Sequence, residues 1–128
     1  MYKTLMTVVV VVAAVTTIST TAQAASRSCG NTNFLDGGGS ARVTIVRGRL
    51  SCTQARGIVR LYGSKRGTSH DFSGHQPLDY ATYPGDWRCS SLEQGNAACF
   101  RGPFGSMKHG MTAASVRHAR DEVALLII

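Results

Sequence analysis

The sequence predicts an α+β fold, in which one main helix packs on a small antiparallel sheet and disulfides cross-link the two. Three observations indicate this class. A strand leads into a well-specified helix between residues 42 and 63, a strand–turn–strand pattern spans 87–101, and the chain carries four cysteines. A chain of 128 residues suits one domain, whose margin of stability is thin enough for cross-links to matter. We place this domain at residues 41–128.

The first 24 residues have the pattern of a secretory signal peptide. A positive charge at Lys3 precedes the apolar run 5–15, and Ala22-Gln23-Ala24 offers the small residues that signal peptidase accepts. A retained transmembrane anchor is the alternative, but the run is about half the roughly 20 apolar residues that a spanning helix needs. We therefore expect residues 1–24 to be removed, the mature chain to have no transmembrane segment, and the protein to be secreted or held in the cell envelope.

Residues 25–40 are expected to form a flexible, Gly-rich lead-in to the domain. The consecutive glycines Gly37, Gly38 and Gly39 have no side chains to pack, and ordering them is entropically unfavourable. They precede a strand and not a helix, so a phosphate-binding loop is not indicated.

The best-specified unit is a strand followed by a helix. Beta-branched residues dominate Arg42 to Arg47, and they alternate in the way that a half-buried strand requires. Ser51 and Gln54 then match a capping box, in which each side chain bonds to the backbone amide of the other residue. We expect Gly63 to end the helix. Its apolar face recurs at three- and four-residue steps and consists of Cys52, Ala55, Ile58, Val59 and Tyr62.

Four cysteines in a small exported chain predict two disulfides, and no C-x-x-C pair indicates a metal site. We favour Cys89–Cys99, which closes a short segment, together with Cys29–Cys52, which ties the N-terminal arm to the start of the helix. A crossed pairing, with Cys52 joined to Cys89 or Cys99, stays open at this point.

The remaining elements are less clearly specified. Trp87 to Cys89 and Ala97 to Arg101 read as two antiparallel strands joined by a turn at 93–96. Residues 64–85 form a long polar segment with weak periodicity, the kind that is functional or mobile in other proteins. The end of the chain fits a helix from about Thr112, which we prefer, although its last apolar residues would also suit a buried strand.

The charge of the chain favours an acidic partner. The formal net charge is +7, and seven cations with no acid among them fall between Arg42 and Arg66. The simpler interpretation is a solvated, like-charged surface. The functional interpretation is an anion-binding face that meets an acidic protein, a glycan or a lipid surface. Nucleic acid is a weaker candidate, because the single aromatic residue in this stretch, Tyr62, is assigned to the core. The candidate binding residues are Arg47, Arg49, Arg56, Arg60, Lys65 and Arg66.

Two other functions are alternatives to a binding protein. A small secreted nuclease or other hydrolase would use Glu93, His109 and Arg101, whose chemistry suits acid–base catalysis and phosphate binding, but nothing in the sequence brings the three together. No G-x-S-x-G pattern indicates a serine hydrolase. A protein inhibitor of a secreted enzyme would present the loop from Thr68 to Pro84.

We expect no metal and no cofactor. Two histidines and two acids in the long polar segment could supply ligands, but their spacing matches no established metal-binding frame. These residues are His70, Asp71, His75 and Asp79.

Three short motifs carry a resemblance to a known group of proteins. After the signal peptide come GRLSCTQARGIVRLY, DWRCSS and CFRG, and this pattern resembles the small exported four-cysteine proteins of mycobacteria and related actinobacteria. The resemblance implies a compact α+β domain, with a helix against a small antiparallel sheet, and it implies no activity. The C-terminal ARDEVALLII lies outside the pattern. The matching residues are Ser51, Cys52, Ala55, Trp87, Cys89, Cys99 and Gly102.

The sequence as a whole therefore predicts a monomeric, exported, disulfide-bonded domain that binds an acidic partner in the envelope or outside the cell, without catalysis. The hydrolase and the inhibitor are the alternatives.

Overall fold

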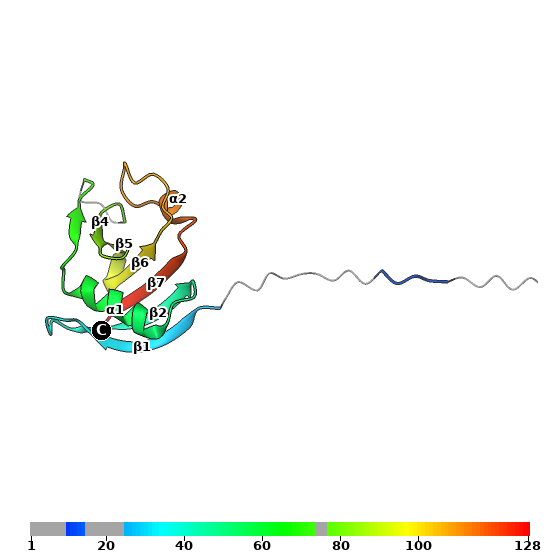
Figure 1. Cartoon of the computed structure of the whole chain (residues 1–128), viewed down its shortest axis with the longest axis horizontal. Helices are drawn as coiled ribbons and strands as arrows, with labels where there is room; N and C mark the ends of the chain where they lie inside the picture. The colour runs from blue at the N-terminus through cyan, green and yellow to red at the C-terminus, as the bar shows by residue number, and fades with distance from the viewer. Residues whose placement is uncertain (1–9, 15–24, 74–76) are drawn as a thin grey trace, which may run out of the picture.

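Most of the described chain is β-structure. The computed structural model describes residues 10–14, 25–73 and 77–128, and across these residues the strands form one antiparallel sheet in the order β1-β2-β7-β6-β5-β4-β3 (Figure 1). The strands are β1 (Arg27–Asn33), β2 (Ser40–Arg47), β3 (Thr68–His70), β4 (Tyr80–Tyr83), β5 (Trp87–Ser91), β6 (Asn96–Arg101) and β7 (Asp121–Ile127). The helical elements are α1 (Cys52–Gly63), the 3₁₀ turn η1 (Glu93–Gly95) and the one-turn helix α2 (Ala113–Val116).

The predicted fold class, one main helix on a small sheet with a C-terminal helix, is therefore wrong. The protein is mainly β, and α1 is its one helix of several turns among the described residues. Three segments that we did not assign to strands enlarge the sheet. The expected lead-in 25–40 contributes β1, the polar segment 64–85 contributes β3 and β4, and the end of the chain contributes β7.

The helix predicted from about Thr112 does begin there, with Thr112 as its N-cap, but it is the single turn α2, and the chain then forms β7. The burial of β7 alternates strictly along the chain, with Asp121, Val123 and Leu125 buried and their neighbours less so. β7 lies between β2 and β6, so both of its edges are hydrogen-bonded within the sheet. The sequence of a short apolar run is compatible with a helix or a strand. Here the run forms a strand because β2 and β6 both offer an unpaired edge to which it can hydrogen-bond.

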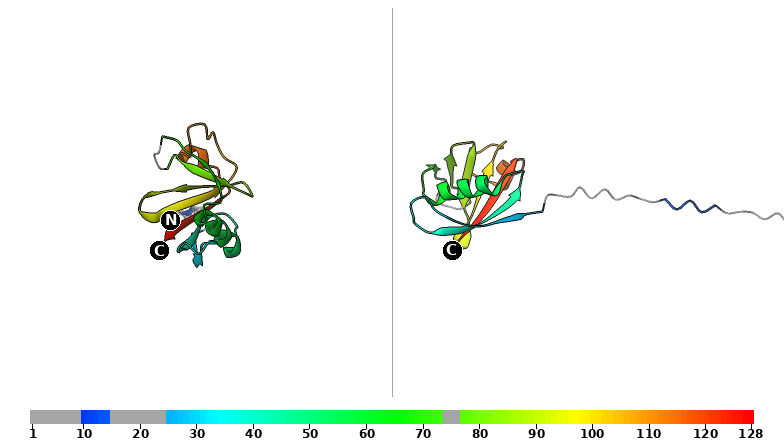
Figure 2. Two further views of the ribbon diagram at one scale, coloured as in Figure 1. Left: turned by 90° about the vertical axis from the view of Figure 1, so that its left-hand side faces the viewer. Right: turned by 60° about the horizontal axis from the view of Figure 1, so that its bottom comes forward.

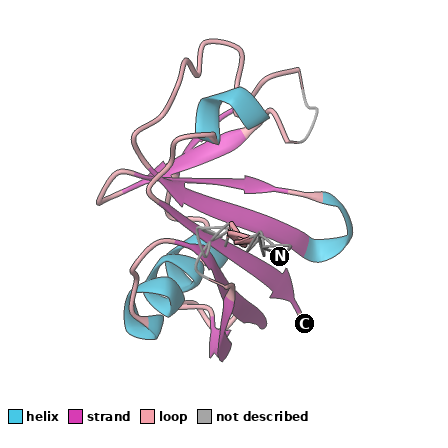
Figure 3. Cartoon of the chain, turned by 90° about the vertical axis from the view of Figure 1, so that its right-hand side faces the viewer, coloured by secondary structure: helices cyan, strands magenta, loops and turns pink. Residues whose placement is uncertain are grey.

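β7 joins two parts of the molecule that are separate along the chain. One part is the hairpin β1–β2, and the other is the four-stranded meander from β3 to β6. α1 lies across one face of the sheet (Figure 2), and its main contacts are with β1 and β2. The segment that carries α2 packs on the opposite face, where Ala98 and Phe100 belong to a separate apolar cluster with Val116 (Figure 3).

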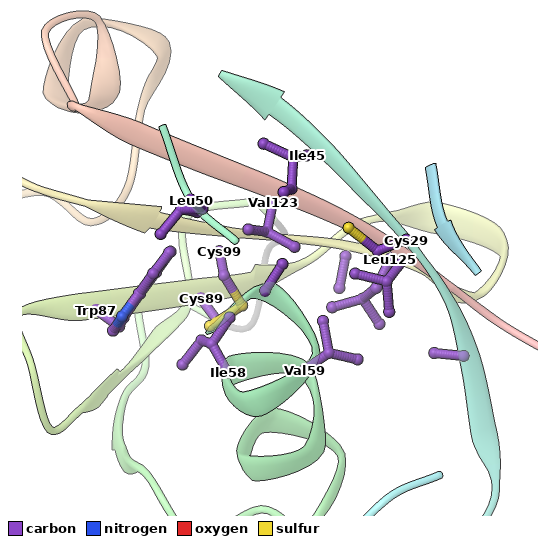
Figure 4. Close-up of a cluster of buried hydrophobic side chains, with 14 of the residues drawn as sticks. Cys29, Ile45, Leu50, Ile58, Val59, Trp87, Cys89, Cys99, Val123 and Leu125 are labelled. Carbon is purple, nitrogen blue, oxygen red and sulfur yellow. A yellow bond between two sulfur atoms is a disulfide. The ribbon is translucent and has the colours of Figure 1, made fainter. Parts of the chain in front are cut away.

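The predicted helix start is confirmed. The Ser51 hydroxyl accepts a hydrogen bond from the Gln54 amide at 3.1 Å, and the Gln54 side chain accepts one from the Ser51 amide at 3.0 Å. The predicted apolar face is also confirmed, since Ala55, Ile58 and Val59 are buried. They pack with side chains from the middle of the sheet to form the main core (Figure 4), which includes Val43, Ile45, Leu50, Val123 and Leu125.

α1 ends at Gly63 as expected, but this glycine is not the residue that terminates the helix through a left-handed backbone. Gly63 is still helical, and a Cβ atom at this position would overlap the ring of Phe34, so a glycine is needed here for packing. The left-handed residue that usually follows a helix is Lys65, with φ of 53°. This position is most often a glycine in other proteins.

The two favoured disulfides are confirmed. Cys29–Cys52 joins β1 to the first residue of α1, and Cys89–Cys99 joins directly opposed residues of β5 and β6. Both cross-links brace the same core, because all four sulfurs lie in it or against it.

The predicted signal peptide lies outside the described residues except for 10–14, which form neither helix nor strand. Among the described residues, no helix has the length and apolar character needed to cross a membrane.

Candidate functional site

Three of the six predicted binding cations are engaged in holding the fold together. Arg47 donates to the carbonyls of Val116 and Arg117, at 3.2 and 3.0 Å, and so anchors the α2 segment to β2. Arg56 donates to the Cys29 carbonyl at 3.0 Å. Arg66 forms an exposed ion pair with Asp36 at 2.8 Å.

The side chains of the other three cations are exposed and have no hydrogen-bond or ion-pair partner among the described residues. Arg49 precedes α1, Arg60 lies in its last turn and Lys65 follows its end. We call these three residues the α1 cations. Arg47 lies on the opposite face of the sheet, where it pairs with Glu122 at 3.5 Å. The expected basic face is thus narrower than predicted and centred on α1.

The three residues considered for a hydrolase are not brought together. Glu93 precedes β6 and Arg101 ends it, which separates them by roughly 17 Å of strand. Arg101 donates to the buried carboxylate of Asp121 at 2.7 Å, and its guanidinium lies 5.1 Å from the centre of the Trp87 ring. His109 is an exposed residue of the loop between β6 and α2.

The histidines and acids of the segment 64–85 do not form a metal centre. Across the residues that the structure describes, no group of three or more His, Cys, Asp or Glu side chains could hold a metal ion. His70 stacks on Tyr80, with ring centres 4.7 Å apart, and Asp79 accepts the Phe72 amide at 2.6 Å. His75 lies outside the described residues.

The loop considered for an inhibitor, Thr68 to Pro84, is for the most part a hairpin of β3 and β4 at the edge of the sheet. β4 pairs in turn with β5, the strand that carries the disulfide partner Cys89. The tip of the hairpin includes residues outside the described part of the chain, so the inhibitor hypothesis stays a prediction.

The structure contains a cleft that the sequence did not indicate. It lies on the same face of the sheet as α1, has a volume of about 500 Å³, and opens between the end of α1 and strands β3, β4 and β5. We call it the inner cleft. It exists because a sheet of seven strands is about 29 Å wide, whereas a helix with its side chains covers only about 10–12 Å. α1 sits over the β1–β2 side, which leaves the other side of this face uncovered.

Tyrosines define the inner wall of the cleft. Tyr62 comes from α1 and shares a hydrogen bond with the Ser91 hydroxyl of β5. Tyr83 comes from β4, is only 7 % exposed, and lies with its ring centre 6.4 Å from that of Tyr62. Burial, and to a lesser extent the neighbouring Tyr62, raise the pKa of Tyr83 to about 12. Its phenol therefore stays neutral at physiological pH.

Polar and charged groups line the open side. Ser69 and Asp71 come from β3 and the residue after it, Asp79 precedes β4, and Lys65 projects from beyond α1. The floor of the cleft is formed by a small side chain, that of Ala81 in the middle of β4. The sequence signal for this site was modest: tyrosines and aspartates in the weakly periodic segment 64–85, whose contact with α1 requires the fold.

A second hollow of about 610 Å³ lies mostly on the opposite face, at the η1 end of the sheet. We call it the outer hollow. Its floor includes Ala98 and Ala124, which are directly opposed on β6 and β7, and its margin carries the carboxylates of Glu93 and Glu122. The hollow follows from these two small residues and from the end of the α2 segment, which covers only part of this face.

Comparisons of the chain with protein-family models, with curated proteins and with solved structures give no match. The resemblance to small exported proteins of actinobacteria therefore stays a prediction.

Proposed function

We propose that this protein is an exported, disulfide-bonded binding protein that meets an acidic partner through the α1 cations and does not catalyse a reaction. The observation that carries the proposal is the set of three exposed cations beside α1 that no acid of the described chain neutralises. The two disulfides are compatible with an oxidising compartment outside the cytoplasm.

The α1 cations are suited to long-range attraction of an acidic partner more than to tight recognition of its shape. An exposed ion pair contributes at most about 1 kcal/mol, so affinity has to come from several cations acting together. Such attraction also weakens as salt screens it over a Debye length of about 8 Å at physiological ionic strength. The acidic partner is an envelope or extracellular protein, a glycan or a lipid surface.

A capture experiment with matched charge reversals tests the proposal. Oxidised mature protein is immobilised and exposed to envelope and culture-filtrate fractions, alongside a variant with Arg49→Glu and Arg60→Glu. The control is a variant with Lys108→Glu and Arg117→Glu, two exposed cations away from α1 that give the same change in net charge. We expect the α1 variant to lose its acidic partners and the control to keep them.

Salt dependence and the control variant together distinguish binding through the α1 cations from a general effect of net charge. Partners captured through the α1 cations should be released as the salt concentration rises. Equal loss by both variants would show that net charge alone is responsible, and full retention by the α1 variant would refute a role for this surface.

The compartment can be tested separately. The mature protein should contain no reactive thiol under non-reducing, denaturing conditions, as measured with a thiol reagent. Two or more reactive thiols would contradict the disulfide-bonded, exported form.

A further inference from the structure

We propose that the inner cleft is a binding site for a neutral carbohydrate, which shares Lys65 with the α1 cations but involves neither Arg49 nor Arg60. The site is formed by the end of α1 on one side and by β3 to β5 on the other, and its volume of about 500 Å³ falls in the range of about 300–1,000 Å³ that small-molecule sites occupy.

The lining groups match a sugar because each of them can satisfy a hydroxyl. Serine and tyrosine hydroxyls both donate and accept hydrogen bonds, and a carboxylate accepts only. Ser69, Ser91 and Asp71 therefore offer acceptors, while Lys65 and the neutral phenol of Tyr83 offer donors. A sugar ring also has apolar C–H faces, which suit the aromatic and aliphatic wall formed by Tyr62, Phe34 and Ile127.

The charges in the cleft exclude a ligand of strong net charge. Two carboxylates, Asp71 and Asp79, oppose an anion, and the ammonium of Lys65 opposes a cation. No ion pair joins Lys65 to either acid within the described chain. Groups of both signs remain available, and burying a charged ligand beside a like charge without a partner is unfavourable. A polyhydroxylated neutral ligand uses both signs without this penalty.

Four non-glycine residues of the described chain have a positive φ, namely Lys65, Ser73, Asp86 and Gln94, and Lys65 is the one of them that lines the cleft. Its φ of 53° is the left-handed conformation that glycine adopts after a helix without steric strain. Lys65 is held there by a hydrogen bond from its amide to the Tyr62 carbonyl at 3.1 Å. A lysine is less stable than a glycine in this conformation, and such strained residues are common at binding sites, so Lys65 is a candidate for a side chain that is retained for binding.

Amide chemical shifts measured by NMR during titration provide the test. The probes are maltotriose, cellotriose and chitotriose, three neutral saccharides that differ in linkage and substituents, each at about 10 mM so that binding with a Kd near 1 mM is visible. We expect at least one of them to shift the amides of β3, β4 and the end of α1. Inorganic phosphate and tetramethylammonium chloride serve as the charged probes. Phosphate should shift only amides near Arg60 and Lys65, and both probes should leave the amides of β3 and β4 unchanged.

Two pairs of variants connect the shifts to the cleft. Ala81→Leu fills the floor and should abolish saccharide binding, while Thr82→Val, at the next residue of the same strand, should not. Asp71→Asn changes an exposed carboxylate that forms no hydrogen bond or ion pair within the described chain, and it should weaken binding about tenfold. No shift with any of the three saccharides, or an undiminished response in Ala81→Leu, would overturn the proposal. A response of the β3 and β4 amides to phosphate in place of the saccharides would do the same.

Lys65→Gly separates binding from structure. The glycine should raise the Tm by relieving the left-handed backbone, and it should lower the saccharide affinity by removing the donor. A lysine with only a structural role would change the Tm and leave the affinity as it was, which would contradict this part of the proposal.

The two proposals can fail independently. Arg49→Glu with Arg60→Glu should leave saccharide binding unchanged, and Ala81→Leu should leave capture of the acidic partner unchanged.

Discussion

The two halves of the sheet face that carries α1 differ in how they are filled. Under α1, Val43, Ile45 and Leu125 are at most 3 % exposed and close-packed with the helix. Beyond the end of α1, the same face presents Ser69 and Ala81, together with the tyrosines of the inner cleft. The first half provides the stability of the domain. The second half is left open because one helix cannot cover seven strands, and it is where a ligand can bind.

The largest expected effect tests the packed half. Ile45→Ala should lower the free energy of unfolding by about 3 kcal/mol, because Ile45 is 2 % exposed and the cavity cannot collapse between β1 and β7. Ala81→Leu, at a half-buried position on the open half of the same face, should change it by about 1 kcal/mol or less, because the cleft has room for the larger side chain. Urea unfolding of both variants measures the difference, and similar losses would mean that the two halves are equally packed.

The next largest effect is a pH dependence of stability caused by Tyr83, which lies where the two halves meet. Its pKa is about 12 in the folded protein against 10.0 for an ordinary tyrosine, so the unfolded chain ionises first as the pH rises. Its contribution to stability is therefore complete below pH 10.0 and disappears between 10.0 and about 12. We expect a loss of about 2 kcal/mol across this window.

Tyr83→Phe is the matching control for this pH dependence. The phenylalanine variant should lose less stability across the same window in urea unfolding. Parallel curves for the two proteins would show that Tyr83 ionises in the folded state as readily as in the unfolded chain.

A smaller effect is expected at the start of α1, on the packed side. Ser51→Ala removes the side-chain acceptor for the Gln54 amide and should cost about 1 kcal/mol. Thr53→Ala, an exposed position in the same turn, should have a smaller effect. Thermal unfolding measures both, and an unchanged Tm for Ser51→Ala would mean that the cap does not stabilise the helix.

The smallest effect has the opposite sign and lies at the other end of α1. Lys65→Gly should stabilise the protein by about 0.5 kcal/mol, because relief of the left-handed backbone slightly exceeds the entropy that the glycine loses on folding. Lys108→Gly, in an exposed loop residue without positive φ, should give no such gain. A loss of stability for Lys65→Gly would contradict the strain that we infer at this residue.

The elements specified by local chemistry were predicted well. The capping box at Ser51 and the 3.6-residue apolar pattern are properties of neighbouring residues, and α1 forms where they place it. The same holds for the hairpin of β5 and β6, whose turn and opposed cysteines lie close in the sequence. The last strand was missed because Val123 and Leu125 suit a helix equally well until β2 and β6 offer their edges.

The candidate sites divide in the same way. The cations around α1 were identifiable from their number and from the absence of acids. The sequence did not show which of these cations are free of partners, because the hydrogen-bond partners of Arg47 and Arg56 are 70 and 27 residues away along the chain. The inner cleft had only a modest signal in the segment 64–85, because its walls come together only in the fold, where Tyr62 of α1 meets Ser91 of β5.

The sequence by itself determined α1, the strand before it, the hairpin of β5 and β6, and the basic charge, because each depends on residues within a few positions or on composition alone. Only the tertiary structure decided that the protein is mainly β, with β7 in the middle of the sheet. It also decided which cations stay free and that a cleft remains beside α1. The physical reason is that strand pairing and surface coverage depend on contacts between distant segments, and no local pattern encodes their arrangement.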